Sequence, residues 1–111
     1  MSKVVDSQAF DHTPNFSYSA RLLGSKWTIL IVRELAQAPK RFSQLQTSLR
    51  GISPRTLAER LRWLEAEGIV SRTTFAEVPP RVEYSLTPKG QGLRPVLTAM
   101  RDYERHWGPI Q

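Results

Sequence analysis

The chain has 111 residues, 40% of them hydrophobic, which fits one folded domain and argues against disorder. It contains no cysteine and only two histidines, so disulfides and thiol chemistry are excluded and we expect neither a metal site nor another cofactor. The net charge is +6, and residues 40–81 carry +4 of it, a concentration that suits a polyphosphate partner but also fits an ordinary solvated surface.

The first third of the chain predicts an arm and two helices. Residues 1–13 show no hydrophobic periodicity and are expected to form a flexible arm. A first helix is expected over residues 15–23. Ser25 can cap a second helix, which runs to about residue 38 and ends before Pro39. Because that second helix is apolar most of the way round, we expect it to be buried in the core.

The middle of the chain predicts two helices joined by a short turn. Apolar residues recur at helical spacing over 41–49, and Gly51 lies in the turn that follows. Ser53 and Pro54 then give a strong start signal, because serine caps a helix and proline favours its first position. The second helix is expected to end near residue 67, so residues 41–67 are predicted to form a helix-turn-helix.

The rest of the chain predicts a hairpin and a long final helix. Two short strands are expected over 69–75 and 81–86, joined by a loop with two prolines. A helix over 88–107 follows, which Pro95 should bend or loosen. This order is that of a winged helix-turn-helix, a mostly helical fold in which residues 69–86 form a small β-hairpin wing.

The helix that follows the turn has one apolar and one polar face. At 100° per residue, Leu61 and Leu64 fall within about 40° of Leu57, so these three leucines are expected to pack inward. Arg55 lies on the opposite side, near the end that a recognition helix presents to base edges, and arginine pairs bidentately with guanine. Arg55 is therefore the first candidate for base reading. The alternative is that Arg55 and Arg62 are ordinary solvent-facing residues that form helix salt bridges with Glu59, each contributing only ~0.5 kcal/mol.

Other residues of the helix-turn-helix and wing are further candidates for DNA contacts. Glu59 could accept a hydrogen bond from cytosine or orient a neighbouring arginine. Arg72 and Arg81 flank the hairpin tip and could reach the DNA backbone or a groove. Because Arg81 alternates with Glu83 along its strand, a simple cross-strand pair is the competing account for Arg81. The complete set, including the phosphate contacts expected at the start of the helix-turn-helix, is Lys40, Arg41, Ser43, Gln44, Ser53, Arg55, Thr56, Glu59, Arg60, Arg62, Arg72 and Arg81.

Several motif blocks occur in a distinctive order and spacing. They are Gly24-Ser25-Lys26-Trp27, Leu35, Arg41-Phe42-Ser43-Gln44-Leu45, Gly51-Ile52-Ser53-Pro54-Arg55, Leu57, Arg60-Leu61-Arg62, Leu64-Glu65, Gly68, Val78-Pro79-Pro80-Arg81-Val82-Glu83-Tyr84-Ser85-Leu86-Thr87 and Gly90. Over residues 22–97 the chain closely resembles the HxlR family of winged helix-turn-helix transcriptional regulators, which are relatives of the MarR group. The resemblance implies that residues 1–111 form a single domain of this type.

The resemblance also implies a homodimer built from the first and last helices. Two recognition helices would then enter successive major grooves of a roughly palindromic operator, with half-sites about 10 base pairs apart or a multiple of that distance. An apolar face that one small domain could not fully cover agrees with this expectation. The residues expected at the dimer interface are Phe16, Leu93, Val96, Leu97, Met100, Tyr103 and Trp107.

The chain departs from the family at one position. Many members carry a cysteine just before the first helix, and some use it to sense oxidants or electrophiles, whereas Pro14 occupies that position here. Any sensing would have to use a non-covalent small molecule, a partner protein or only the abundance of the regulator. A crevice between the dimer helices and the DNA-binding domain would be the natural place for an effector, with Phe16, Tyr18 and Trp27 as candidates for its lining.

Two other classes of function compete with the regulator. A winged-helix protein-interaction module with only non-specific DNA affinity is the main alternative, because a fold does not fix a function. An enzyme is disfavoured, because no nucleophile, base and orienting group stand at helpful spacing. The longest apolar run, over residues 27–32, is far shorter than the ~18 residues of a membrane helix. No signal peptide is apparent over residues 1–10, so a cytoplasmic location without membrane contact is expected.

Overall fold

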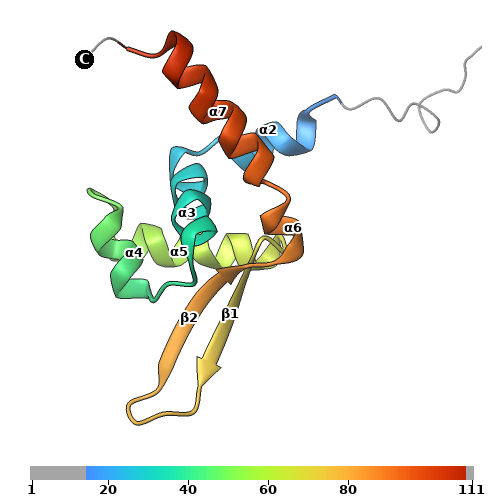
Figure 1. Ribbon diagram of the computed structural model, residues 1–111. Helices are drawn as coiled ribbons and strands as arrows, with labels where there is room; N and C mark the ends of the chain where they lie inside the picture. The colour runs from blue at the N-terminus through green and yellow to red at the C-terminus, as the bar shows by residue number, and fades with distance from the viewer. Residues whose placement is uncertain (1–14, 110–111) are drawn as a thin grey trace, which may run out of the picture.

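The computed structural model describes residues 15–109, and the expected arm at residues 1–13 lies outside this range. The elements follow the order expected from the sequence, with a two-stranded antiparallel hairpin after the helix-turn-helix (Figure 1). They are α2 (Ser17–Leu23), α3 (Lys26–Gln37), α4 (Phe42–Ser48), α5 (Pro54–Ala66), β1 (Val70–Phe75), β2 (Arg81–Leu86), α6 (Pro88–Gln91) and α7 (Arg94–Trp107). The fold is therefore mostly helical with a small β-hairpin wing.

Side-chain caps begin three of the helices. Ser25, Ser53 and Thr87 each accept a hydrogen bond from a main-chain N–H two or three residues further on, over 3.0–3.2 Å. Pro54 and Pro88 occupy the first turn of their helices, where the missing N–H has no partner to lose. A cap of this kind typically stabilises a helix by about 1 kcal/mol. The start signals predicted at positions 53 and 54 are thus confirmed.

The prediction of a single helix over residues 88–107 is wrong, because the chain forms two helices there. α6 ends at Gln91, and α7 begins at Arg94 with Pro95 in its first turn. A helix continuing through Pro95 would lose a hydrogen bond and bring the proline ring against the carbonyl of Gln91. Starting a new helix removes that clash, so α7 is free to leave in a direction of its own.

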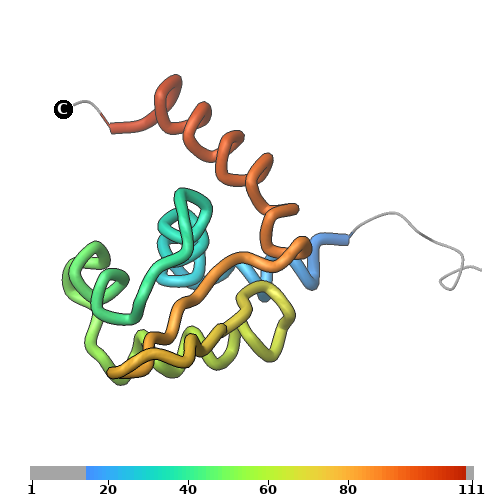
Figure 2. Tube along the Cα trace, turned by 60° about the horizontal axis from the view of Figure 1, so that its bottom comes forward, coloured from blue at the N-terminus to red at the C-terminus, as the bar shows by residue number. Residues whose placement is uncertain are grey.

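The core is built around α3, which contacts α2, α4, α5, α7 and β2. Ile31, Val32 and Leu35 of this helix are buried, as expected for a helix that is apolar most of the way round. Full burial of each such side chain stabilises the fold by roughly 1.5–3 kcal/mol. Figures 1 and 2 show α5 and the wing on one side of α3 and α7 on the other.

The wing is tied to the helix-turn-helix by a link that the sequence pattern does not reveal. β1 and β2 pair with Val70 opposite Leu86 and Phe75 opposite Arg81. Lys40, just before α4, forms a β-bridge with Tyr84 of the second strand: each main-chain N–H donates to the other's carbonyl, over 3.0 and 2.8 Å. The position of the wing relative to the helix-turn-helix is therefore fixed by main-chain bonds.

Candidate nucleic-acid interface

The helix α5 buries one face and exposes the other. Leu57, Leu61 and Leu64 are at most 1% exposed, which confirms the orientation expected from their spacing. Arg55 and Arg62 lie on the outward side, and both are exposed. The polar face of the second helix of the helix-turn-helix is thus free to meet a ligand.

The first turn of α5 is held by two hydroxyl groups. The Ser53 hydroxyl accepts from the main-chain N–H of Thr56 and donates to the Thr56 hydroxyl, over 3.0 and 2.9 Å. Ser53 therefore serves the start of the helix, and both residues lie at the end that a recognition helix directs to the bases.

Arg55 and Glu59 form an ion pair, with Arg55 Nε 3.2 Å from a Glu59 carboxylate oxygen. The Arg55 side chain is 87% exposed, so the pair contributes little to stability. Within residues 15–109, only the Nε of Arg55 is hydrogen-bonded, and the terminal nitrogens of its guanidinium are free to donate. Of the two salt bridges considered as the alternative, the described residues form the one with Arg55 and not the one with Arg62, and the bridge leaves Arg55 able to pair with a guanine.

Arg62, Arg72 and Tyr84 meet at a hollow between α5 and the wing. The hollow has a volume of about 430 Å³, and Ala58 and Glu65 complete its lining. Within the described part of the chain, neither arginine has a carboxylate within 4.0 Å. Arg62 and Arg72 were expected from the sequence, whereas Tyr84 was not, because only the folded wing brings it beside them.

Arg60 lies on the edge of the buried face of α5. Its guanidinium carbon stands 5.1 Å from the centre of the Trp63 ring, a cation–π arrangement. The position agrees with the helical spacing, but the side chain is directed along the helix towards Trp63 and is half-buried.

Lys40 is directed inward rather than into solvent. Its ammonium lies 3.8 Å from a carboxylate oxygen of Glu34, a buried residue of α3 that also pairs with Arg33 at 2.9 Å. A buried carboxylate needs compensating charge, and Lys40 supplies part of it. The structure therefore gives Lys40 a role in the core, beside the phosphate contact expected from its position in the sequence.

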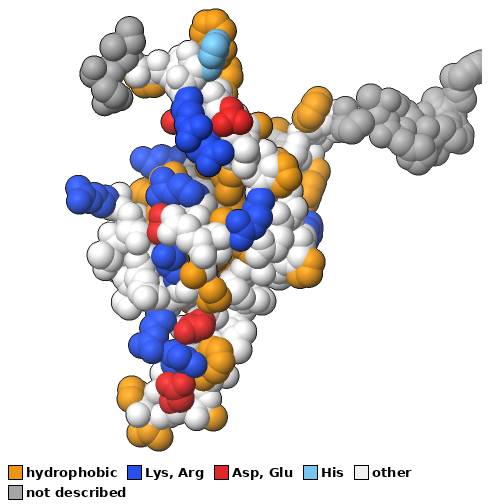
Figure 3. Space-filling view, in the orientation of Figure 1, with side chains coloured by type: hydrophobic (Ala, Val, Ile, Leu, Met, Phe, Trp, Pro, Cys, Tyr) orange, Lys and Arg blue, Asp and Glu red, His pale blue; other side chains and the backbone are white. Residues whose placement is uncertain are grey.

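Arg81 is engaged by acidic neighbours within the wing. Its guanidinium lies 3.0 Å from Glu77 and 3.7 Å from Glu83, and its central carbon is 4.0 Å from the centre of the Phe75 ring. Glu83 lies on the same strand as Arg81 and Glu77 lies in the loop, whereas the residue opposite Arg81 across the strands is Phe75. Figure 3 shows basic and acidic side chains together on the wing and hydrophobic side chains at its tip, so the wing does not end in a purely basic surface.

The start of α4 offers a smaller set of polar groups. Gln44 accepts a hydrogen bond from the main-chain N–H of Arg41 over 2.8 Å and so caps the helix. Arg41 and Ser43 are exposed. Arg50, in the turn before α5, is another exposed basic residue. Its place between the two helices was the sequence signal that could have marked it as a candidate.

The helix α7 carries an apolar face with no partner in the described part of the chain. Val96, Met100, Tyr103 and Trp107 are all exposed, the last two by 67% and 70%. Leu93 and Leu97, also expected at the dimer interface, are instead packed against the core. Phe16, just before α2, is 71% exposed. The expected interface residues therefore divide into a core-facing pair and an outward-facing set.

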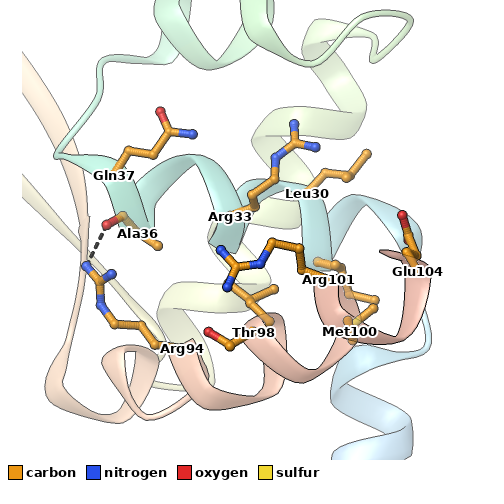
Figure 4. A pocket seen from close by; sticks show the side chains of 11 residues that line it. Leu30, Arg33, Ala36, Gln37, Arg94, Thr98, Met100, Arg101 and Glu104 are labelled. Atoms are coloured by element: carbon orange, nitrogen blue, oxygen red, sulfur yellow. Dashed lines mark hydrogen bonds between the residues drawn. The ribbon is translucent and has the colours of Figure 1, made fainter. Parts of the chain in front are cut away.

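A second hollow, of about 430 Å³, lies between α3 and α7. Figure 4 shows Arg33 and Arg101 on facing helices with Leu30 and Met100 beside them, while Arg94 donates a hydrogen bond to the carbonyl of Ala36. The residues expected to line an effector site, Phe16, Tyr18 and Trp27, do not line this hollow.

Two features of residues 15–109 bear on other kinds of site. No cluster of three or more His, Asp or Glu side chains in this range is arranged to hold a metal ion. None of the described helices is long and apolar enough to span a membrane.

Comparisons with known proteins agree with this geometry. The model of the HxlR-like helix-turn-helix family matches residues 22–111. An uncharacterized helix-turn-helix-type transcriptional regulator of Synechocystis is 49% identical over 86 residues, which are 78% of this chain and 64% of that protein. This chain thus spans less than two thirds of that relative.

Solved structures give the same result. The redox regulator HypR in its oxidized form shares 32% identity, with a TM-score of 0.81 over 87% of this chain and all of that one. A structure from Enterococcus faecalis, described as a transcriptional regulator of the MarR family, shares 34% identity, with a TM-score of 0.78 over 93% and 94%. Family and relatives are transcriptional regulators rather than enzymes. The chain therefore belongs to the HxlR-like helix-turn-helix family, and the relatives that it matches are described as transcriptional regulators.

Proposed function

We propose that the chain acts as a homodimer on a roughly palindromic operator and reads its sequence through the N-terminal half of α5. The observation that carries the proposal is the outward face of α5, on which Arg55 is oriented by Glu59 and keeps its terminal nitrogens free. Arginine in this position suits the paired acceptors of guanine in the major groove. We expect the regulator to work in the cytoplasm, where bacterial operators lie.

The exposed face of α7 supports the dimer. Tyr103 and Trp107 would remain largely in water in a single chain, and aromatic side chains of this size contribute strongly to interfaces when they are buried. A second copy of the chain would cover them by two-fold symmetry. The same symmetry would place two copies of α5 on the two halves of the operator.

The proposed regulator works without thiol chemistry. HypR is a redox regulator, whereas this chain contains no cysteine in its 111 residues. A non-covalent effector is the alternative, and the hollow between α3 and α7 is a suitable place (Figure 4). Its guanidinium groups and apolar wall would suit an organic acid. If small aromatic acids changed neither the melting temperature of the protein nor its affinity for DNA, the proposal of a non-covalent effector would be abandoned.

Selection from genomic DNA tests the function as a whole. The purified protein is incubated with fragmented DNA of its host at two salt concentrations, because affinity for DNA has meaning only at a stated salt. Enrichment of a short two-fold symmetric motif that survives the higher salt is the expected result. Retention without a motif, lost at the higher salt, would favour a winged-helix interaction module with only non-specific DNA affinity.

A further inference from the structure

The hollow between α5 and the wing brings together three hydrogen-bond donors from separate elements. Arg62 comes from α5, Arg72 from β1 and Tyr84 from β2, and all three line the same space of about 430 Å³. Arg72 and Tyr84 stand directly opposite each other in the strand register, so their side chains are close neighbours. Such a set of donors is suited to an anion.

The charges in this hollow are not balanced by the protein. Among the described residues, Arg55 and Arg81 each have a carboxylate within 4.0 Å, while Arg62 and Arg72 have none. Glu65 also lines the hollow, but its carboxylate is in ion-pair range of neither arginine. Two guanidinium groups that share a hollow repel each other, and an anion between them would relieve this repulsion. A guanidinium group is suited to phosphate, because its N–H groups can donate to two phosphate oxygens at once.

The back of the hollow is held in place by the core. Tyr84 is fixed by its two main-chain hydrogen bonds with Lys40, whose ammonium is in turn directed to the buried Glu34. Within residues 15–109, the Tyr84 hydroxyl takes part in no hydrogen bond, so it remains able to donate to a ligand.

The hollow also lies where a DNA backbone would pass. Arg62 is seven residues after Arg55, about two helical turns or ~10 Å further along the same outward face. A duplex whose bases meet Arg55 would bring a sugar–phosphate strand to the later part of α5 and to the wing beside it (Figure 2).

From this geometry we infer that Arg62, Arg72 and Tyr84 together hold one phosphate of the DNA backbone, between the recognition helix and the wing. The inference rests on the DNA binding proposed above. One phosphate held from both sides would fix the wing against α5 and set the depth at which Arg55 meets the bases. Arg62 and Arg72 would then act as one unit rather than as two separate phosphate contacts.

The dependence of affinity on salt distinguishes one shared phosphate from two. The logarithm of the binding constant falls with the logarithm of salt concentration by about 0.9 for each phosphate neutralised. We therefore expect R62A/R72A to reduce this slope by about 0.9 per protomer, and R62A or R72A alone to produce most of that change. A reduction of about 1.8 per protomer in the double variant would mean two separate phosphates and would overturn the inference.

Chemically altered DNA locates the contact. Duplexes in which one phosphate at a time is replaced by a neutral methylphosphonate should show one sensitive position per half-site for the unaltered protein. The affinity of R62A/R72A should not change further at that position, and Y84F should bind several-fold more weakly to unaltered DNA. Equal sensitivity of the unaltered protein and the double variant at every position would contradict the shared contact.

Controls separate this inference from the proposed function and from misfolding. Arg105, on α7, is exposed and lies outside the hollow, so R105A removes the same charge and should leave the slope nearly unchanged. All variants should keep the melting temperature of the unaltered protein. If genomic selection yields no motif but the salt-dependence slopes of the variants on random duplex change as expected, the proposed sequence specificity is contradicted and the phosphate site is supported. If selection yields a motif but the variants have the slope of the unaltered protein, the sequence specificity is supported and the phosphate site is contradicted. If inorganic phosphate displaced DNA more effectively than another salt at the same ionic strength, the hollow would be a site for a free anion, and the inference of a DNA backbone contact would be overturned.

Discussion

Arg55 and Glu59 lie one turn apart on the outward face of α5, joined by a contact of 3.2 Å between Arg55 Nε and a Glu59 oxygen. This contact uses one donor of the guanidinium and restricts the direction in which the others point. A preorganised arginine loses less conformational entropy when it binds a base. If α5 reads the operator as proposed, this weak surface salt bridge would therefore contribute to base recognition by orienting Arg55.

Replacing Glu59 should separate affinity from specificity. E59A removes a negative charge next to DNA phosphates and releases Arg55, so affinity for random duplex should rise while preference for the operator falls. Competition binding with operator and random duplexes at one salt concentration measures both quantities. If E59A retained the full preference for the operator, Glu59 would have no orienting role.

Lys40 should contribute to stability more than to DNA binding. K40M leaves the buried Glu34 with Arg33 as its remaining partner, and we expect a loss of about 1–3 kcal/mol in the free energy of unfolding. E34Q/K40M should recover much of this loss, because the uncompensated charge is gone. Urea denaturation measures the stabilities. A reduced salt dependence of DNA binding in K40M, by about 0.9 per protomer, would instead identify Lys40 as a phosphate contact.

The outward face of α7 should control assembly. W107E places a charge where the dimer model requires an apolar side chain, so W107E should be monomeric at concentrations at which the unaltered protein is a dimer. Sedimentation equilibrium measures this difference, and R105E on the same helix serves as the matched control. The model of the dimer fails if the unaltered protein is monomeric or if W107E and R105E assemble equally well.

Gly51 should contribute to stability only through its backbone conformation. Its φ is +89°, and an added Cβ would meet no atom within 4 Å, so the cost of a side chain is conformational rather than steric crowding. We expect G51A to lower the free energy of unfolding by about 1 kcal/mol and G51N by less, because asparagine tolerates left-handed backbone better. Equal stability of G51A and the unaltered protein, measured by urea denaturation, would contradict this account.

Local signals predicted the helix-turn-helix well because they depend on neighbouring residues. The serine and proline at positions 53 and 54 start α5, and the spacing of Leu57, Leu61 and Leu64 sets its buried face. The break before α7 was underestimated, because Pro95 was expected to bend a helix that it in fact restarts.

Contacts between distant segments were beyond reach of the sequence pattern. The Lys40–Tyr84 bridge joins residues 44 positions apart, and no local pattern around residue 40 marks it as a partner of a strand. The meeting of Arg62, Arg72 and Tyr84 depends on long-range packing, because β1 contacts α5 and the bridge joins β2 to the segment before α4. The sequence left two interpretations of Arg81 open, a DNA contact and a pairing within the wing. The loop before β2 brings Glu77 close to Arg81, and this contact depends on loop geometry that the sequence pattern does not predict.

The most direct test is the affinity of R55A for the selected operator and for random duplex at the same salt concentration, with R50A as a matched control from the preceding turn. If Arg55 reads a base, R55A should lose roughly 1–3 kcal/mol on the operator and much less on random DNA. R50A should weaken both by similar amounts. Equal losses of R55A on both duplexes would remove Arg55 from base reading and contradict the proposed recognition by α5.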